Sequence, residues 1–257
     1  MSEEKPKSAT LYFIAGFFCA ALIAVVLLRP DYASAPEAAR RYTCAGNLNQ
    51  IETAMLCYHD QYGQFPPAYT VDAAGKPLHS WRTLLLPFIE EGDNPYTNLY
   101  KEIRLDEPWD SPHNMAVYKD TSINTYKCPS NPAENPILTS YVMVTGPNCI
   151  SDGPNVCGFK DLTKPLCRTA HIVETNVPIR WYEPKDLKAD EINFKINDPT
   201  SPGIGSGHPG IVQIAFCNGF VKAITQSTSP DELRAMFEIK ANKETKPKTE
   251  KIAPETQ

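Results

Sequence analysis

The sequence predicts a mixed fold in which one long N-terminal helix is followed by a turn-rich head of short strands and a closing helix. After Pro36, apolar residues recur at three- and four-residue steps, which is typical of an amphipathic helix. Later apolar runs are strand-sized and are separated by Pro, Gly, Asn or Asp. Proline makes up 24 of the 257 residues, above the usual share of about 5%, so we expect long loops.

The overall composition is that of an ordinary globular chain. The net charge is −5 and the hydrophobic content is 42%, which is enough to bury a sizeable core. The chain has no basic face with interleaved aromatic residues, the pattern that nucleic-acid-binding proteins show. We therefore expect no nucleic-acid partner.

Residues 10–28 form an uncharged apolar run that predicts a transmembrane helix, with residues 1–9 as a cytoplasmic N-terminus. As a helix, the run would span about 29 Å, close to the thickness of a bilayer core. A cleaved signal peptide is the alternative, because the small residues 33–35 resemble a cleavage site. The apolar run exceeds the usual length of a signal peptide, and Pro36 would follow the cut directly. We expect a retained anchor.

The cysteines that follow this anchor indicate its orientation more clearly than the charges beside it do. Positive residues flank the apolar run on both sides, so their count does not favour an outside head. Seven of the eight cysteines follow the apolar run, which suits an oxidising compartment. We expect a single-pass protein of the inner (cytoplasmic) membrane, with residues 36–239 outside the cytoplasm. The flanking positive residues are Lys5 and Lys7 before the run and Arg29, Arg40 and Arg41 after it.

Three helices are indicated by their end signals. The first runs from Pro36 to Gly63. The stretch "SWRTLLLPFIEE" predicts a short helix with Ser80 as N-cap and an end or kink at Pro87. In "SPDELRAMFEI", Ser229 is the expected N-cap of a final helix. The apolar stripe of the first helix consists of Cys44, Leu48, Ile51, Met55, Tyr58 and Tyr62.

Between Glu91 and Gly207 we expect short strands in long loops, with strands at residues 139–146 and 170–175. From about Lys240 the chain lacks periodicity and is rich in Lys, Glu, Thr and Pro. We expect residues 240–257 to form a disordered tail.

The stretch "HPGIVQIAFCNGF", residues 208–220, predicts a β-hairpin, because Asn-Gly between alternating apolar residues is a strong hairpin signal. A two-residue turn would pair Phe216 with Val221 and would need positive φ at both Asn218 and Gly219. His208 would then be a structural residue at the entry of the first strand. This pairing would give the hairpin one inner face, made of Val212, Ile214, Phe216, Val221 and Ala223.

Two further groups of residues have both a chemical and a structural interpretation. Cys149, Cys157, Cys167 and His171 could supply tetrahedral zinc ligands, but their spacing is not that of a zinc module, and disulfides in a proline-rich loop are favoured. Asp110 and His113 could form an acid–base pair. The prolines beside them favour turn hydrogen bonds instead.

Several stretches of the chain resemble a pilin-like family of unknown function, abundant in planctomycete bacteria, whose C-terminal signature is His-x9-Asp-Gly. In order, these stretches are "RRYTCAGNLNQIETAMLCYHDQYGQFPP", "SWRTLLLPFIEE", "EPWDSPHN", "YKCPSNP", "WYEPKDL" and "HPGIVQIAFCNG". The resemblance implies a pilin-like α+β fold, with a long N-terminal helix packed on a small antiparallel sheet, and no established activity.

The chain departs from the family pattern at two places. His208 and Gly219 match the signature, but Asn218 replaces its Asp. At the front, Ala21 stands where a prepilin cleavage site would have glutamate, so we expect no prepilin processing. The resemblance also implies a disulfide between Cys44 and Cys128, because both lie in motifs shared with the family.

We therefore expect a membrane-anchored, extracytoplasmic pilin-like protein with a structural or interaction role, whose partners are the membrane and proteins outside the cytoplasm. We expect no catalytic residue, no cofactor and no metal. The alternative is an extracytoplasmic hydrolase or metal-dependent enzyme that uses His208, His113 or His171. A secretion-system pseudopilin is a third hypothesis, which the missing glutamate weakens.

Overall fold

The computed structural model describes residues 30–89, 95–131 and 135–240. The chain divides into two compact units, Met1–Tyr42 and Thr43–Gln257, and the fold below is that of the second. No helix within the described ranges combines the length and the apolar character needed to cross a membrane. The expected transmembrane run at residues 10–28 and most of the expected disordered tail lie outside the described residues.

Helix α2, Pro30–Tyr62, begins earlier than expected, so Pro36 lies inside it and not at its start. A proline within a helix removes one backbone hydrogen bond without always ending the helix. The expected apolar stripe is buried at Cys44, Leu48, Ile51 and Met55, but Tyr58 is only half-buried and Tyr62 is exposed. The helix ends as expected before Gly63, whose φ of +75° suits a C-terminal cap.

A five-stranded sheet with the order β5-β3-β4-β6-β7 forms the centre of the head. Strand β5 pairs in parallel with β3, and the other pairs are antiparallel, so the sheet is mixed and not purely antiparallel as expected. The strands are β3 (Leu138–Thr145), β4 (Ala170–Arg180), β5 (Leu187–Lys188), β6 (Ile211–Phe216) and β7 (Val221–Thr225).

A small antiparallel pair, β1 (Tyr69–Val71) and β2 (Pro77–Ser80), leads into α3 (Trp81–Leu84). Ser80 caps α3 as expected, and its hydroxyl accepts from the N–H of Arg82. Helices α4 (Pro95–Glu102) and α5 (Pro112–Tyr118) were not expected from the sequence. Short 3-10 turns complete this part of the chain: η1 (Leu86–Phe88), η2 (Asn124–Tyr126), η3 (Phe159–Asp161) and η4 (Leu166–Arg168).

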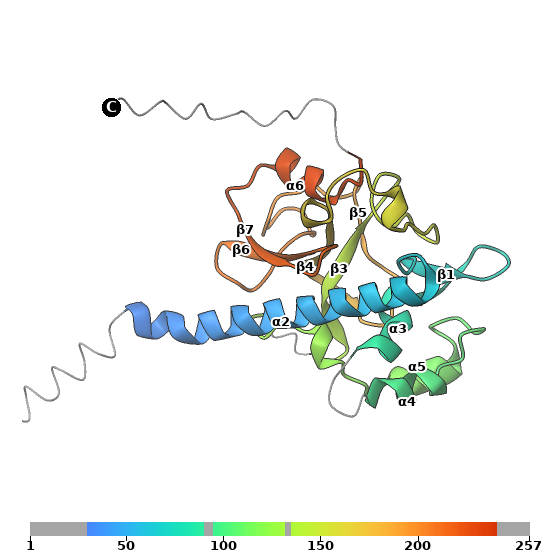
Figure 1. The fold of residues 1–257 in the computed structure, drawn as a ribbon. Helices are drawn as coiled ribbons and strands as arrows, with labels where there is room; N and C mark the ends of the chain where they lie inside the picture. Colours follow the sequence, from blue (N-terminus) through green and yellow to red (C-terminus); the bar gives the residue numbers. More distant parts are fainter. Residues whose placement is uncertain (1–29, 90–94, 132–134, 241–257) are drawn as a thin grey trace, which may run out of the picture. The chain divides into compact units, whose positions relative to one another are not determined.

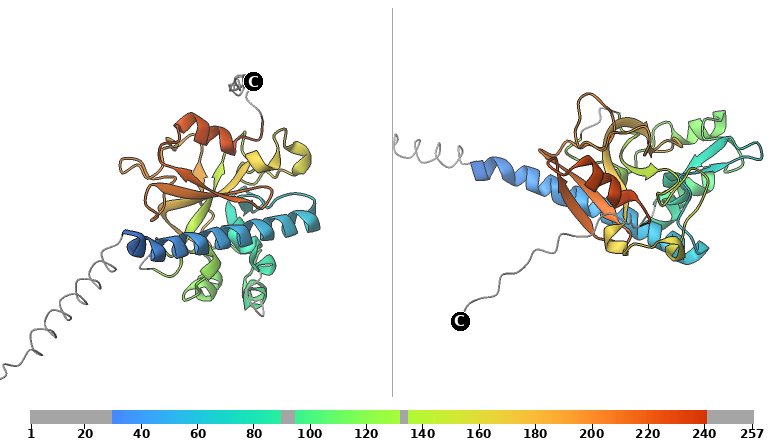
Figure 2. Two further views of the ribbon diagram at one scale, coloured as in Figure 1. Left: turned by 60° about the vertical axis from the view of Figure 1, so that its left-hand side comes forward. Right: turned by 90° about the horizontal axis from the view of Figure 1, so that it is seen from above.

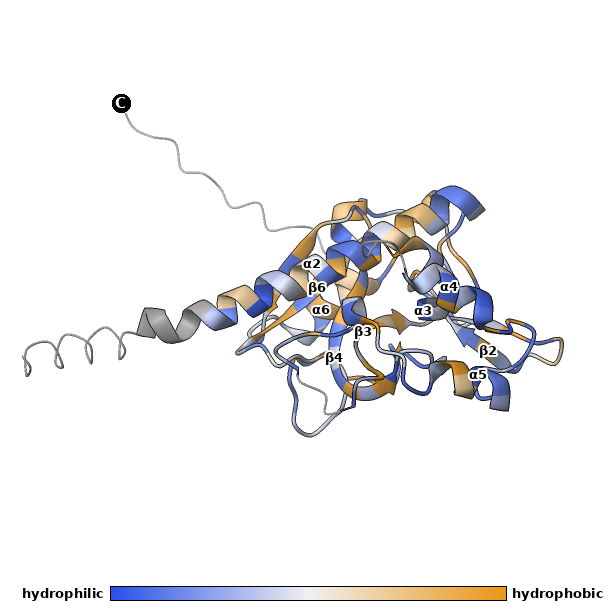
Figure 3. Ribbon diagram, turned by 90° about the horizontal axis from the view of Figure 1, so that it is seen from below, coloured by the Kyte–Doolittle hydropathy of each residue, from blue (hydrophilic) through white to orange (hydrophobic). Residues whose placement is uncertain are grey.

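The sheet is covered on both faces. Residues 43–62 of α2 cross one face, and α6 (Pro230–Phe237) covers the other (Figures 1 and 2). Ser229 caps α6 as expected, in a capping box with Glu232. Hydrophobic and hydrophilic residues are mixed along α2 (Figure 3), and its buried residues recur at three- and four-residue steps, which places them on one face.

The two faces enclose separate apolar cores, because successive residues of a strand point to opposite sides. On β4, Ile172 joins Leu48 and Ile51 of α2 in the first core. Its neighbour Val173 joins Leu233 of α6 in the second core. The functional groups described below lie in the first core.

The β6–β7 hairpin forms where expected but with a different turn and register. Ala215 faces Val221, so the strands are shifted by one residue from the expected pairing. The N–H of Gly219 donates to the carbonyl of Phe216, and the N–H of Phe216 donates to the carbonyl of Phe220. Gly219 has a φ of +83° whereas Asn218 does not have positive φ. The loop therefore has three residues, and the last of them, Gly219, is in the left-handed conformation. This loop is a common alternative to the two-residue turn.

This register corrects the expected inner face of the hairpin. Val212, Ile214 and Phe216 do point together into the core beneath α6. Val221 packs against the opposite core, and Ala223 is exposed.

We expect Gly219→Ala to lower the free energy of unfolding by about 1 kcal/mol, because alanine resists positive φ. An added Cβ would meet no atom within 4 Å, so the effect should come from the backbone alone. Asn218→Asp is the matched control and should be nearly neutral, since either side chain can accept from the N–H of Phe220. Urea unfolding of the purified full-length variants measures both effects. Equal stability of Gly219→Ala and the wild type would contradict the turn assigned here.

Candidate functional site

A layer of buried polar side chains lies between α2 and the sheet. We call it the polar layer, and each of its members is less than 3% exposed. It contains two acid–histidine pairs, one beside the disulfide and one beside a free cysteine. The polar layer consists of Cys44, Glu52, Cys128, His171, Glu174, His208 and Cys217.

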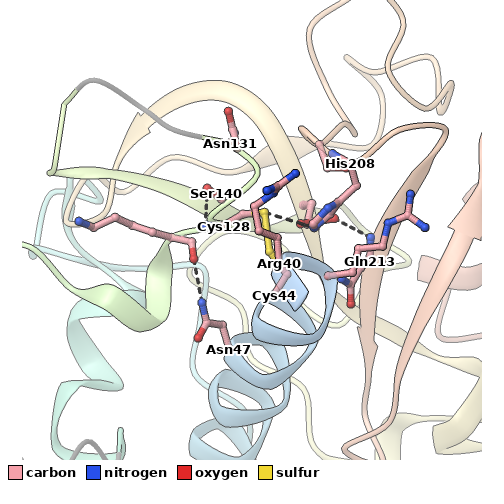
Figure 4. Close-up of a disulfide and its surroundings, with 12 residues drawn as sticks. Arg40, Cys44, Asn47, Cys128, Asn131, Ser140, His208 and Gln213 are labelled. Carbon is pink, nitrogen blue, oxygen red and sulfur yellow. Dashed lines mark hydrogen bonds and ion pairs between the residues drawn. A yellow bond between two sulfur atoms is a disulfide. The ribbon is translucent and has the colours of Figure 1, made fainter. Parts of the chain in front are cut away.

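The disulfide expected between Cys44 and Cys128 is present, with Cα atoms 5.3 Å apart (Figure 4). Cys44 lies on α2 and Cys128 in the loop after η2, so the bond joins the helix to the head. The N–H of Cys128 donates to the hydroxyl of Ser140 at 3.0 Å. One turn along α2, the side chain of Asn47 donates to the carbonyl of Lys127 at 2.7 Å, which adds a second tie.

His208 lies against this disulfide and is 1% exposed (Figure 4). Its Nε2 atom is 3.4 Å from Cys128 Sγ and 3.4 Å from Glu174 Oε1. The other carboxylate oxygen of Glu174 accepts from the N–H of Gln213 at 2.7 Å. His208 is therefore a buried group between a disulfide and a carboxylate, not a residue on an open loop.

The loop that carries His208 is held close to the loop that carries Cys128. A Cβ atom added at Gly207 would lie 1.6 Å from the carbonyl oxygen of Ser130, so only glycine fits there. The hydroxyl of Ser206 accepts from the N–H of His208 and donates to the carbonyl of Ile211. Gly207 thus allows the two loops to pack closely.

The second acid–histidine pair joins α2 directly to β4. His171 Nδ1 lies 3.0 Å from Glu52 Oε2, and both side chains are fully buried. The pairing of β4 with β6 shifts between Ala170 and Ile172, which indicates a β-bulge at His171. A bulge re-aims a side chain, which explains why His171 lies on the same face of the sheet as Ile172. Cys217 also contributes its thiol to this cluster.

The expected zinc set of Cys149, Cys157, Cys167 and His171 is not assembled, and the expected disulfides among its cysteines are not formed. These three cysteines are free. Cys149 packs in the core beneath α6 and Cys157 in the core beneath α2, so the sheet separates them. Cys167 is exposed. Both interpretations were wrong: Cys149 lies on the opposite face of the sheet from Cys157, and Cys167 is exposed at the surface.

Asp110 and His113 do not form an acid–base pair among the described residues. His113 lies in the first turn of α5, where its Nε2 contacts the carbonyl of Glu102 at 2.9 Å. Asp110 is exposed just before that helix. His113 therefore contacts the backbone of another helix, eleven residues away, and not the local turn that was expected.

None of three cavities in the described part of the chain is lined by a histidine. Their volumes are about 310, 560 and 370 Å³. The first lies beside α6 and contains Cys149, whose burial raises the pKa of its thiol to about 12. The second is lined largely by aromatic residues near the end of α2, and the third by residues of β7 and α6. The candidate histidines and these cavities are therefore in different places.

Sequence reasoning missed both carboxylates of the polar layer and one buried histidine. Glu52 follows Ile51 on the buried side of α2, where a charged residue is rarely found without a partner. Glu174 belongs to "AHIVET", where only the strand was expected. His79, on β2, is 1% exposed and its Nε2 contacts the carbonyl of Glu107 at 2.8 Å. Only the long-range pairing of the fold reveals these three roles.

The fold and the polar layer define the class of the protein. It has an α+β head, to which the N-terminal helix α2 is fixed by a disulfide. The family of proteins of unknown function DUF1559 matches residues 33–181, more than half of the chain. The chain belongs to this family. The match ends before His208, so it does not include the C-terminal signature noted in the sequence. No curated protein and no solved structure matches the chain.

We expect replacement of both Cys44 and Cys128 by serine to lower the free energy of unfolding by up to about 4 kcal/mol, because the bond closes a long loop in the unfolded chain. The two cysteines are 84 residues apart. Urea unfolding under oxidising conditions measures the loss. Cys57→Ser with Cys167→Ser, which removes two exposed free thiols, is the control and should change little. A similar loss in the control would show that the disulfide is not the cause.

We expect the free energy of unfolding to decrease in acid, partly because the side chain of His79 is buried. Burial lowers the pKa of His79 below its ordinary value of 6.5. Below that pH the unfolded chain binds a proton that the folded chain does not, so the free energy of unfolding decreases as pH falls. His79→Gln, which can still donate to the carbonyl of Glu107, should flatten this dependence. Unfolding curves at several pH values between about 7.5 and 5.5 test this, and identical slopes in both proteins would refute it.

Proposed function

We propose that this protein is a membrane-anchored, pilin-like structural or interaction protein whose head lies outside the cytoplasm and has no catalytic activity. The observation that carries the proposal is the buried disulfide between Cys44 and Cys128, which fixes α2 to the head. Disulfides persist in oxidising compartments and are rare in the cytosol. The disulfide makes the second half of α2 part of the head, which suits a structural role.

The anchor in this proposal is the apolar run of residues 10–28. That run is uncharged and as long as a bilayer core is thick. The arrangement of α2 across a sheet supports the pilin-like part of the proposal, since a long N-terminal helix on a small sheet is what the resemblance implies. The anchor and the disulfide together favour a head that lies outside the cytoplasm.

The alternative of a hydrolase or metal-dependent enzyme is less well supported by the histidines. His208 and His171 are buried beside carboxylates, and His113 contacts a backbone carbonyl. Cys217, His171 and Glu52 are residue types that can serve as a nucleophile, a base and an acid, respectively. Burial raises the pKa of the Cys217 thiol well above its ordinary value, which disfavours the thiolate that would be the nucleophile. A substrate could not reach this cluster, because all three residues are buried.

We expect a membrane-impermeant maleimide to label the head in intact spheroplasts that express the full-length chain. Cys57 and Cys167 are free and exposed, so they should supply most of the label. The matched control replaces both by serine and should lose it, since the other free cysteines described are buried. A cytoplasmic marker protein should remain unlabelled. Labelling that appears only after the membrane is permeabilised would contradict an outside head.

A further inference from the structure

Four potential metal ligands meet at the disulfide. Cys44, Cys128, Glu174 and His208 each offer one ligand atom, and all four atoms lie within 4.8 Å of one another. All four residues are buried. The close-up in Figure 4 shows His208 directed at the Cys44–Cys128 bond from the loop before β6.

We propose that when this disulfide is reduced, the two cysteines, Glu174 and His208 bind one Zn²⁺ ion. Thiolate, imidazole and carboxylate are the ligands that Zn²⁺ takes in proteins, and structural zinc sites have four of them in a tetrahedron. Two thiolates and one carboxylate around the ion would leave the site with a single net negative charge. This lies between neutral sites of two cysteines with two histidines and doubly negative sites of four cysteines. The inference goes beyond the proposed function: in an oxidising compartment the disulfide is the stable state, and the ion would bind only where a dithiol has reduced it.

A buried oxygen of Glu174 that accepts no hydrogen bond within the described part of the chain is the second observation that points to an ion. Glu174 Oε1 is buried and accepts no hydrogen bond from the described residues, although Glu174 is only 1% exposed. His208 Nε2 lies 3.4 Å from this oxygen, beyond normal hydrogen-bond length. A buried carboxylate oxygen that accepts no hydrogen bond is costly, and in native proteins such an oxygen is often satisfied by a bound ion or water. In the proposed site this oxygen becomes a ligand.

The ligands are held in place by contacts that do not involve the S–S bond. The N–H of Cys128 donates to Ser140, and Glu174 Oε2 accepts from the N–H of Gln213. The N–H of His208 donates to Ser206, and Gly207 allows the two loops to touch. Cys44 is fixed by its position on α2. Reduction should therefore leave the four side chains close together.

The chemical step balances with a dithiol as reductant. The dithiol gives two electrons and two protons to the S–S bond and becomes a disulfide, while Cys44 and Cys128 become thiols. Zn²⁺ then displaces one proton from each thiol and forms four ligand bonds, with neutral His208 as the nitrogen donor. Oxidation reverses the exchange, so the same residues would hold either a disulfide or an ion. His208, expected to be structural only, would be a ligand in the reduced chain.

The cluster of Glu52, His171 and Cys217 is the competing site. It offers three ligand atoms within 4.8 Å of one another and needs no reduction. Glu52 Oε2 and His171 Nε2 are also buried without a hydrogen bond from the described residues, so this cluster could accept an ion too. It offers only three ligand atoms, however, one fewer than a structural zinc site has. The experiment must therefore distinguish the two clusters.

The test is a Co²⁺ titration of the purified full-length chain, followed by displacement with Zn²⁺. Co²⁺ in a tetrahedral site with thiolates gives strong visible absorption and a sulfur-to-metal charge-transfer band. We expect one equivalent to bind to the chain reduced by a phosphine without oxygen, and none to bind to the oxidised chain. Glu174→Gln and His208→Gln should each weaken binding at least about tenfold, as loss of even indirect support of a ligand can, while the charge-transfer band remains.

The matched control is Cys57→Ser, which removes an exposed free thiol and should not alter the titration. His171→Gln tests whether the ion binds at the competing cluster instead. If the reduced chain has lost its circular dichroism spectrum, Zn²⁺ should restore it, because metal binding and folding are coupled. The proposal is overturned if the reduced chain binds no ion, if Zn²⁺ fails to restore a lost fold, or if Cys128→Ser binds as tightly as the wild type. It is also overturned if His171→Gln, and not His208→Gln, abolishes binding.

Discussion

The contact between α2 and the central strand β4 is the constraint on which the rest of the head depends. The buried face of α2 is not purely apolar, because Cys44 and Glu52 lie on it among Leu48, Ile51 and Met55. A buried carboxylate is tolerated only with a partner, since its desolvation has a cost on the order of several kcal/mol. His171 is that partner for Glu52, and Cys128 is the covalent partner of Cys44. The helix can therefore pack in one register only, the one that brings both pairs together.

This register in turn orders segments that are distant in the sequence. The Glu52–His171 contact spans 119 residues, and the contact between Cys128 and His208 spans 80. The bulge in β4 turns His171 toward α2, and Gly207 lets the His208 loop approach the Cys128 loop. On the same side of the head, the buried ion pair of Arg82 and Asp186 at 2.7 Å connects α3 to the segment before β5. In each case a polar contact specifies which elements meet, while apolar burial supplies the general stabilisation.

The parts of this fold that could be predicted are those whose cause is local. Ser80 and Ser229 cap their helices and Gly63 ends α2, because caps act within one turn of the chain. The hairpin was predictable but its register was not, since Asn-Gly is compatible with both a two-residue and a three-residue turn. In the site, only the disulfide was anticipated, through a family resemblance. The pairs of Glu52 with His171 and of Glu174 with His208 could not be, because one sequence does not reveal which distant strands are neighbours.

The central claim is that residues 43–62 of α2 belong to the cooperative core of the head and are not an independent stem. Native-state hydrogen exchange of the oxidised full-length chain tests it most directly. If the claim is right, the amides of Leu48–Met55 exchange with the same opening free energy as those of Ile172–Glu174 in β4, because neither segment can open without breaking the polar layer. Exchange of the α2 amides at a much lower free energy, while β4 stays protected, would contradict it.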